Sequence, residues 1–144
     1  MTRADEAVGL FRQGYSCSQS ILKVYGAGRS VAEQDLLKLA TGFGGGMARM
    51  GGTCGAVTGA FMALGLAYGQ VSAEDAESKE KTYAFIQEFA DRFKEKHGSL
   101  TCRDLLGYDL GTPEGRLAAK ASGRVDAFCP TLVRDAAEIL EELI

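Results

Sequence analysis

The chain has 144 residues, of which 46% are hydrophobic, and a formal net charge of −3. This length lets one domain bury a core without crosslinks. The acidic balance, with a pI of about 5.2, argues against a nucleic-acid-binding surface, because such a surface needs an excess of basic residues.

Helical periodicity runs through the chain from end to end. Apolar residues recur at three- and four-residue spacing, and no segment alternates apolar and polar residues as a strand would. Ser30, Ser72 and Pro130 are interpreted as helix starts, because Ser is a favoured N-cap and Pro is favoured at the first helical position. The predicted helices cover residues 3–13, 17–25, 30–41, 53–68, 72–96, 99–106 (helix or turn), 112–123 and 130–144, with a glycine-rich loop at 42–46.

An uncharged segment at residues 50–73 is long enough to cross a bilayer by count alone. Glycines interrupt it repeatedly, and its helical part at 53–68 is too short for a comfortable span. A helix that is apolar on all sides is normally the buried centre of a domain. We therefore expect an all-α single domain over residues 1–144, a helical bundle around a buried, uncharged central helix, with no membrane span.

The N-terminal segment at residues 1–6 carries early charges, and no apolar stretch typical of a secretory signal follows it. We therefore expect a cytoplasmic protein. Structural disulfides are rare in the cytosol, where paired cysteines tend to be catalytic or bound to metal.

The four cysteines are each predicted to lie where a helix begins. Cys17 and Cys54 directly follow a hydroxyl residue that can cap a helix, Cys102 comes three residues after a serine, and Cys129 directly precedes Pro130. A helix start offers unpaired N–H groups and the positive end of the helix dipole, which stabilise a thiolate. Four such placements predict thiol chemistry.

The glycine-rich segment around Cys54 bears on the same site. Glycine permits positive φ and close approach of the backbone, so this segment is predicted to hold backbone amides around the Cys54 sulfur. The alternative is that Gly55 and Gly59 only let helices pack closely. Both interpretations are compatible with each other.

Three basic residues are candidate contributors to the site. Arg49 and Arg103 lie near Cys54 and Cys102 in the sequence and could lower a thiolate pKa, although exposed surface positions are commoner for arginine. His97, the single histidine, is predicted at the end of the long helix, so neither a Cys–His hydrolase nor a histidine-based metal site is expected.

No two cysteines form a C-x-x-C pair, so the thioredoxin motif and the usual zinc knuckles are missing. Any site must therefore be assembled by the fold. Four cysteines permit three disulfide connectivities, and the sequence does not choose among them. Four thiolates also match the ligand count of a structural zinc or an iron–sulfur cluster. A further alternative is four buried, unreactive cysteines.

The order of the cysteines resembles a known family. Cys17 is followed by Cys54-Gly55-Ala56-Val57-Thr58-Gly59, then by Cys102 and Cys129. This pattern is similar to that of the redox-active protein family named for its C…GCAxxG…C…C cysteines, and the central element here reads C-G-A-x-x-G. The resemblance covers residues 15–130 and implies a redox-active role. Related members with selenocysteine at a cysteine position imply nucleophilic thiol chemistry rather than structural zinc. No substrate is implied.

Within that resemblance, each cysteine receives a predicted role. Cys54 is predicted to be the attacking thiolate, because it combines a helix start with neighbouring glycines. Cys17 is predicted to be its resolving partner, since it has a similar position after a capping serine. Cys102 and Cys129 are predicted to form a second pair that relays electrons to or from an outside disulfide by thiol exchange.

Three functions are left open. The first is thiol–disulfide exchange or electron transfer without a cofactor, as in a thiol–disulfide oxidoreductase whose partner is a redox protein or a small thiol or disulfide. The second is an electron carrier that binds zinc or an iron–sulfur cluster with Cys17, Cys54, Cys102 and Cys129 as ligands. The third is a non-catalytic helical module, a homodimer through the uncharged central region.

Overall fold

Helices account for the regular structure in the computed structural model, which describes residues 1–144. Strands are absent, as the periodicity predicts, and an isolated antiparallel bridge joins Thr53 to Thr101. The helices are α1 (Arg3–Arg12), α2 (Cys17–Tyr25), α3 (Glu33–Thr41), α4 (Gly44–Met47), α5 (Gly55–Tyr68), α6 (Ala76–His97), α7 (Cys102–Leu106), α8 (Pro113–Ser122) and α9 (Arg124–Leu143). The predicted all-α fold class is confirmed.

Local capping explains the helices whose bounds agree best with the prediction. The Ser16 hydroxyl accepts a hydrogen bond from the Gln19 backbone N–H, and the Gln19 side chain accepts one from the Ser16 N–H. This capping box satisfies two donors that the start of α2 would otherwise leave free. α8 begins with Pro113 after the capping residue Thr112 and ends at Gly123, as expected from the preferences of these residue types.

Three helices, α3, α6 and α7, begin three or four residues later than predicted, and α7 begins at Cys102 rather than at residue 99. α3 begins at Glu33 rather than at Ser30, and no side chain caps it. α6 begins at Ala76, and its cap is Asp75 rather than Ser72. A carboxylate caps a helix as well as a hydroxyl does, and its charge also interacts favourably with the helix dipole.

The largest correction concerns the last helix. α9 begins at Arg124, directly after Gly123 at φ 71°, and not at Pro130. Pro130 lies inside the helix, where it provides no N–H donor for the carbonyl of Asp126. Asp126 is exposed, so water can reach this part of the helix and replace the missing donor. Cys129 therefore lies inside a helix, and its predicted position at a helix start is wrong.

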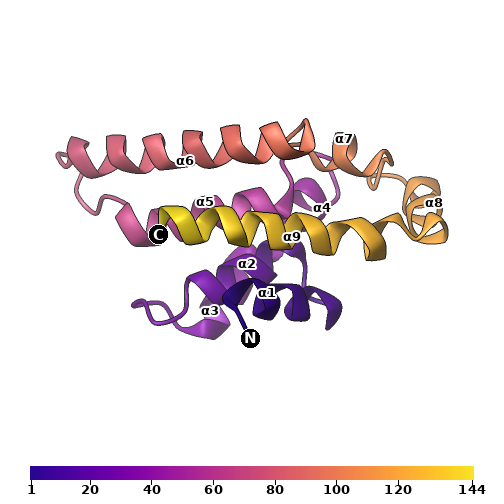
Figure 1. Cartoon of the computed structure of the whole chain (residues 1–144), viewed down its shortest axis with the longest axis horizontal. Coiled ribbons are helices and arrows are strands. Elements are labelled where there is room, and N and C mark those ends of the chain that lie inside the picture. The colour runs from indigo at the N-terminus through magenta and orange to yellow at the C-terminus, as the bar shows by residue number, and fades with distance from the viewer.

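The helices form three layers (Figure 1). α6 runs along one side, α5 and α9 form the middle, and α1, α2 and α3 form the other side. α5 contacts α2, α6 and α9, and α9 also contacts α1. The short helices α4, α7 and α8 gather at one end of the molecule, around the N-terminal ends of α5 and α9.

α5 carries no charged residue. Its first residues, 55–60, are all buried, whereas Leu66 near its end is exposed. None of the helices combines the length and the apolar character that crossing a membrane requires.

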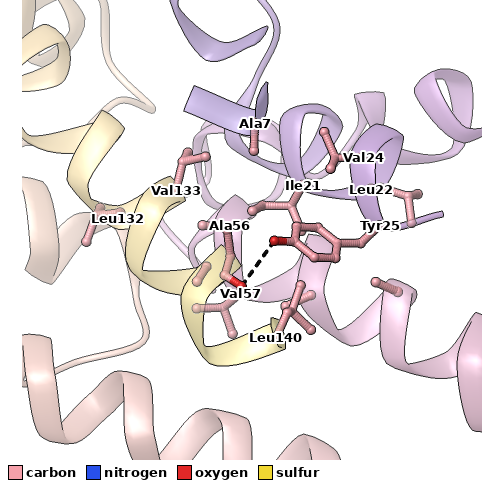
Figure 2. Packing of buried hydrophobic residues seen from close by; sticks show 14 of the residues in the cluster. Ala7, Ile21, Leu22, Val24, Tyr25, Ala56, Val57, Leu132, Val133 and Leu140 are labelled. Carbon is pink, nitrogen blue, oxygen red and sulfur yellow. Dashed lines mark hydrogen bonds between the residues drawn. The ribbon is translucent and has the colours of Figure 1, made fainter. Parts of the chain in front are cut away.

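α2, α5 and α9 meet in the hydrophobic core shown in Figure 2. Ile21 from α2, Val57 from α5 and Leu140 from α9 are fully buried there. The Tyr25 hydroxyl donates a hydrogen bond to the Ala137 carbonyl, 3.2 Å away, and so ties α2 to α9. Each large apolar side chain buried in this way contributes about 1.5–3 kcal/mol. Packing in this core therefore holds α2, α5 and α9 in place, together with their cysteines Cys17, Cys54 and Cys129.

A left-handed turn connects α4 to the segment before α5. Residues 45–49 all have positive φ, from 50° at Ala48 to 71° at Arg49. The last three of these residues are not glycines, and an L-residue in this region costs about 1–2 kcal/mol. The Arg49 N–H donates to the Gly44 carbonyl at 3.2 Å. The glycine-rich loop predicted at residues 42–46 therefore runs into a defined turn.

Candidate functional site

The fold brings all four cysteines to one cavity. Cys17 comes from the start of α2, Cys54 is the N-cap of α5, Cys102 begins α7, and Cys129 lies inside α9. All four are free thiols. The cavity has a volume of about 170 Å³, and its lining residues are Phe11, Ser16, Cys17, Gly45, Cys54, Gly55, Cys102, Leu106, Leu110, Val125, Cys129 and Leu132. Three of the four predicted helix-start positions are confirmed, and the thiols face a largely apolar space.

Cys17 packs against the cluster that contains Cys129. Hydrogen bonding between the two thiols is the largest influence on both, and it lowers the pKa of Cys129 below its ordinary value of 9.0. The same contact, together with burial, raises the pKa of Cys17 well above that value. The two thiols therefore titrate as a pair, and these directions favour Cys129 as the first to lose its proton.

Arg124 adds a positive charge beside Cys129. Its guanidinium lies 3.9 Å from the centroid of the Phe128 ring and donates a hydrogen bond to the Leu105 carbonyl at 3.0 Å. After hydrogen bonding with Cys17, the largest influence, burial raises the pKa of Cys129, Arg124 lowers it, and Asp126 raises it. The sequence interpretation missed Arg124 because it began the last helix too late. A helix from 124 onward would have placed Arg124 one turn before Phe128.

Cys54 has the helix-start environment that the sequence predicts, but burial outweighs it. Cys54 is only 3% exposed, and this burial raises its pKa to about 11. The backbone N–H groups of Ala56 and Val57 act in the opposite direction and lower the pKa. These N–H groups belong to α5 itself and not to the glycine-rich loop. At neutral pH Cys54 is therefore a thiol.

Backbone pairing holds Cys102 beside Cys54. The Cys54 N–H donates to the Leu100 carbonyl and the Cys102 N–H donates to the Gly52 carbonyl, each at 2.7 Å. These bonds lie on either side of the isolated bridge and join the start of α5 to the start of α7. Burial, followed by the neighbouring sulfurs of Cys54 and Cys129, raises the pKa of Cys102 to about 12. Cys102 is also a thiol at neutral pH.

Close packing explains the glycines around the cavity. A Cβ at Gly46 would lie 2.6 Å from the Cβ of Cys102, and a Cβ at Gly55 would lie 3.2 Å from the Cβ of Cys17. A Cβ at Gly59 would likewise lie too close to the backbone of α2. The interpretation that Gly55 and Gly59 permit close helix packing is confirmed.

The two arginines chosen from the sequence do not act on the cysteines. Arg103 is exposed and faces Asp109 at 4.0 Å, while the side chain of Arg49 lies over Gly45. Neither arginine is among the groups that shift a cysteine pKa. The favoured interpretation of both arginines as exposed surface residues is confirmed, and the alternative, that they lower a thiolate pKa, has no support.

The single histidine lies at the end of α6, as predicted, and does not line the cavity. The side chain of His97 is 8% exposed, and its Nε2 lies 2.8 Å from a carboxylate oxygen of Asp135 in α9. The Phe128 ring packs edge-on against the imidazole at 5.9 Å and also contacts the cysteine cluster. His97 therefore ties α6 to α9 and forms part of the support behind the site.

Four free cysteines gathered by an all-α fold around one cavity define a thiol protein whose site is built without any local cysteine motif. A family model matches residues 15–143, a range that contains all four cysteines, and the family is described as "Putative redox-active protein (C_GCAxxG_C_C)". The chain belongs to this family. Comparisons with curated proteins and with solved structures found no match.

Proposed function

We propose that the protein is a thiol–disulfide oxidoreductase in which Cys129 attacks and Cys17 resolves. The observation that carries the proposal is the contact between these two sulfurs, which lowers the pKa of Cys129 and raises that of Cys17. The thiolate is the attacking form of cysteine, and a pKa closer to neutral pH increases the fraction present. Burial keeps Cys54 and Cys102 protonated and less reactive.

The reaction proceeds by two exchanges. The Cys129 thiolate attacks one sulfur of a substrate disulfide, which forms a mixed disulfide and releases a thiolate that takes the proton of Cys17. The Cys17 thiolate then attacks the Cys129 sulfur, and the second substrate thiolate leaves and takes a proton from solvent. The substrate gains two electrons and two protons and becomes two thiols, while Cys17 and Cys129 are oxidised to a disulfide.

This assignment differs from the roles predicted from the sequence, in which Cys54 attacks and Cys17 resolves. The contact with Cys129 favours a different partner for Cys17, and the backbone pairing favours Cys54 with Cys102 as the second pair. In this scheme Cys54 and Cys102 reduce the Cys17–Cys129 disulfide by exchange and become a disulfide themselves. The pairing of Cys54 with Cys17 stays a prediction that the same experiment tests.

Single Cys→Ser variants test the assignment with a small chromogenic disulfide under anaerobic conditions. We expect Cys129→Ser to lose the fast phase of thiol release, and Cys17→Ser to accumulate a mixed disulfide on Cys129 that mass spectrometry locates. Cys54→Ser is the matched control, because it removes a buried thiol from the same cavity, and its first exchange should stay fast. A mixed disulfide on Cys54, or a fast phase lost only in Cys54→Ser, would restore the sequence-based roles.

Metal binding by the four cysteines is the second candidate, because all four thiols line one cavity. Zinc and iron–sulfur sites need three or four ligands that converge on one point. No group of three or more cysteine, histidine, aspartate or glutamate side chains has an arrangement that could hold a metal ion. We therefore place exchange first. Near-stoichiometric zinc, or iron with acid-labile sulfide, in protein purified without oxygen would reverse this order.

A further inference from the structure

An outer hollow adjoins the cysteine cavity on the side of the left-handed turn. This hollow, of about 410 Å³, is lined by Ser16, Gly45 and Leu110, and these three residues also line the cysteine cavity. The shared walls place the hollow next to the cysteine cavity. A molecule that spans the two spaces would have one part in the hollow and another part at the sulfurs.

The charged residues in its lining distinguish this hollow from a second hollow beside the cysteine cavity. Arg49 is the one charged residue in its lining, and Arg49 takes part in no ion pair. A second hollow adjoins the cavity at Phe11, but its lining holds both Arg12 and Asp126, so its charges cancel. An anionic group is therefore attracted to the first hollow and not to the second.

The cavity itself limits what can reach the sulfurs. Its volume of about 170 Å³ is less than half that of the adjoining hollow. Apart from the cysteines, its walls are largely apolar, with side chains such as Phe11, Leu106 and Leu132. Such a small, largely apolar space favours a disulfide with short alkyl arms over a disulfide inside a folded protein.

We propose that the substrate is a small organic disulfide with a carboxylate arm, whose sulfurs occupy the cysteine cavity while the carboxylate binds Arg49 in the outer hollow. This inference rests on the proposed thiol–disulfide exchange and adds the class of its substrate. The Cys129 thiolate attacks the substrate sulfur nearest to it, and Cys17 completes the reaction as described above. The two thiols produced leave through the hollow, one or both of them with a carboxylate.

The test compares three small symmetrical disulfides of similar size that carry carboxylates (dithiodiglycolate), hydroxyls (bis(2-hydroxyethyl) disulfide) or ammonium groups (cystamine). We measure their reduction by the fully reduced full-length protein under anaerobic conditions, with each rate divided by the rate of the same disulfide with a free small thiol. This ratio removes intrinsic differences in disulfide reactivity. We expect the ratio for the carboxylate compound to exceed that for the hydroxyl compound by about five- to tenfold, as one exposed charge contact allows.

Arg49→Gln should abolish this preference and Arg49→Lys should keep most of it. Arg12→Gln is the matched control, because it removes the same charge from the neighbouring hollow, and it should leave the preference unchanged. In the wild-type protein the preference should shrink as ionic strength rises, which tests the charge contact without any substitution.

The outcomes separate this inference from the function on which it rests. If the hydroxyl compound is reduced as well as the carboxylate compound, or if Arg49→Gln keeps the preference, the substrate class proposed here is overturned while thiol–disulfide exchange stands. If the protein reduces none of the three compounds faster than a free thiol does, the proposed function fails, and this inference fails with it.

Discussion

A methyl group added at Gly46 tests whether the left-handed turn is held in place by Cys102. The new Cβ would lie 2.6 Å from the Cβ of Cys102 and 2.7 Å from the carbonyl oxygen of Gly52, so backbone has to move. A left-handed alanine costs about 1–2 kcal/mol, and the loss of glycine flexibility in the unfolded chain returns about 0.5–1 kcal/mol. Overpacking in a dense region adds about 1–3 kcal/mol. We therefore expect Gly46→Ala to lower the free energy of unfolding by about 2–4 kcal/mol.

Gly45→Ala is the matched control. Gly45 has φ 68°, close to the 70° of Gly46, but its Cβ would meet only the side chain of Arg49 at 3.1 Å and more distant atoms. Its cost should be about 0.5–1 kcal/mol, from backbone strain alone. Urea unfolding of the reduced proteins, followed by circular dichroism, measures both. Equal destabilisation by the two substitutions would refute the packing contact with Cys102.

Three further predictions concern the cysteines and the turn. Between pH 9 and 11 the unfolded state loses the Cys54 proton while the folded state keeps it, so unfolding free energy falls as pH rises. In Cys54→Ala the unfolding free energy, measured by urea unfolding, should fall by about 3 kcal/mol less over this pH range. An unchanged pH dependence would contradict the effect of burial on the Cys54 pKa. Arg124→Gln should raise the pKa of Cys129, seen as an upward shift of the first thiolate titration by ultraviolet absorbance, whereas Arg103→Gln should leave it unchanged. Ala48→Gly should stabilise the reduced protein by about 0.5–1 kcal/mol, because it relieves left-handed strain at φ 50°; lower stability in urea would count against that strain.

Much of the fold could be predicted because its signals are local. Ser16 and Gln19 form their capping box within four residues, and Thr112 with Pro113 starts α8 within two. Pro130 shows where local signals fail, since a proline at the first turn of a helix and one in its interior look alike in sequence. What decides between them is the packing of residues 124–129 against the rest of the molecule, which periodicity does not encode.

The four cysteines of the candidate site could be predicted from the sequence, but the role of each cysteine could not. The prediction that a helix start lowers the Cys54 pKa has the right direction, because N–H groups of α5 do lower it. Burial reverses the net result, and burial depends on which helices cover the sulfur. The contact between Cys17 and Cys129 likewise depends on how α2 and α9 cross, so no spacing rule could have paired them.

We expect access to the thiols to depend on the local stability of the left-handed turn. Its three non-glycine residues together hold on the order of 3–6 kcal/mol of conformational strain, which is comparable with the whole stability of many small domains. Opening the turn releases this strain, so we expect it to open at a lower free energy than the helices around it. Gly45 is a wall of the cysteine cavity, so we expect opening of the turn to widen access to the sulfurs while the rest of the molecule stays folded. A substitution that relaxes the turn should therefore slow thiol modification even as it stabilises the fold, and amide hydrogen exchange at residues 45–49 would report the same opening.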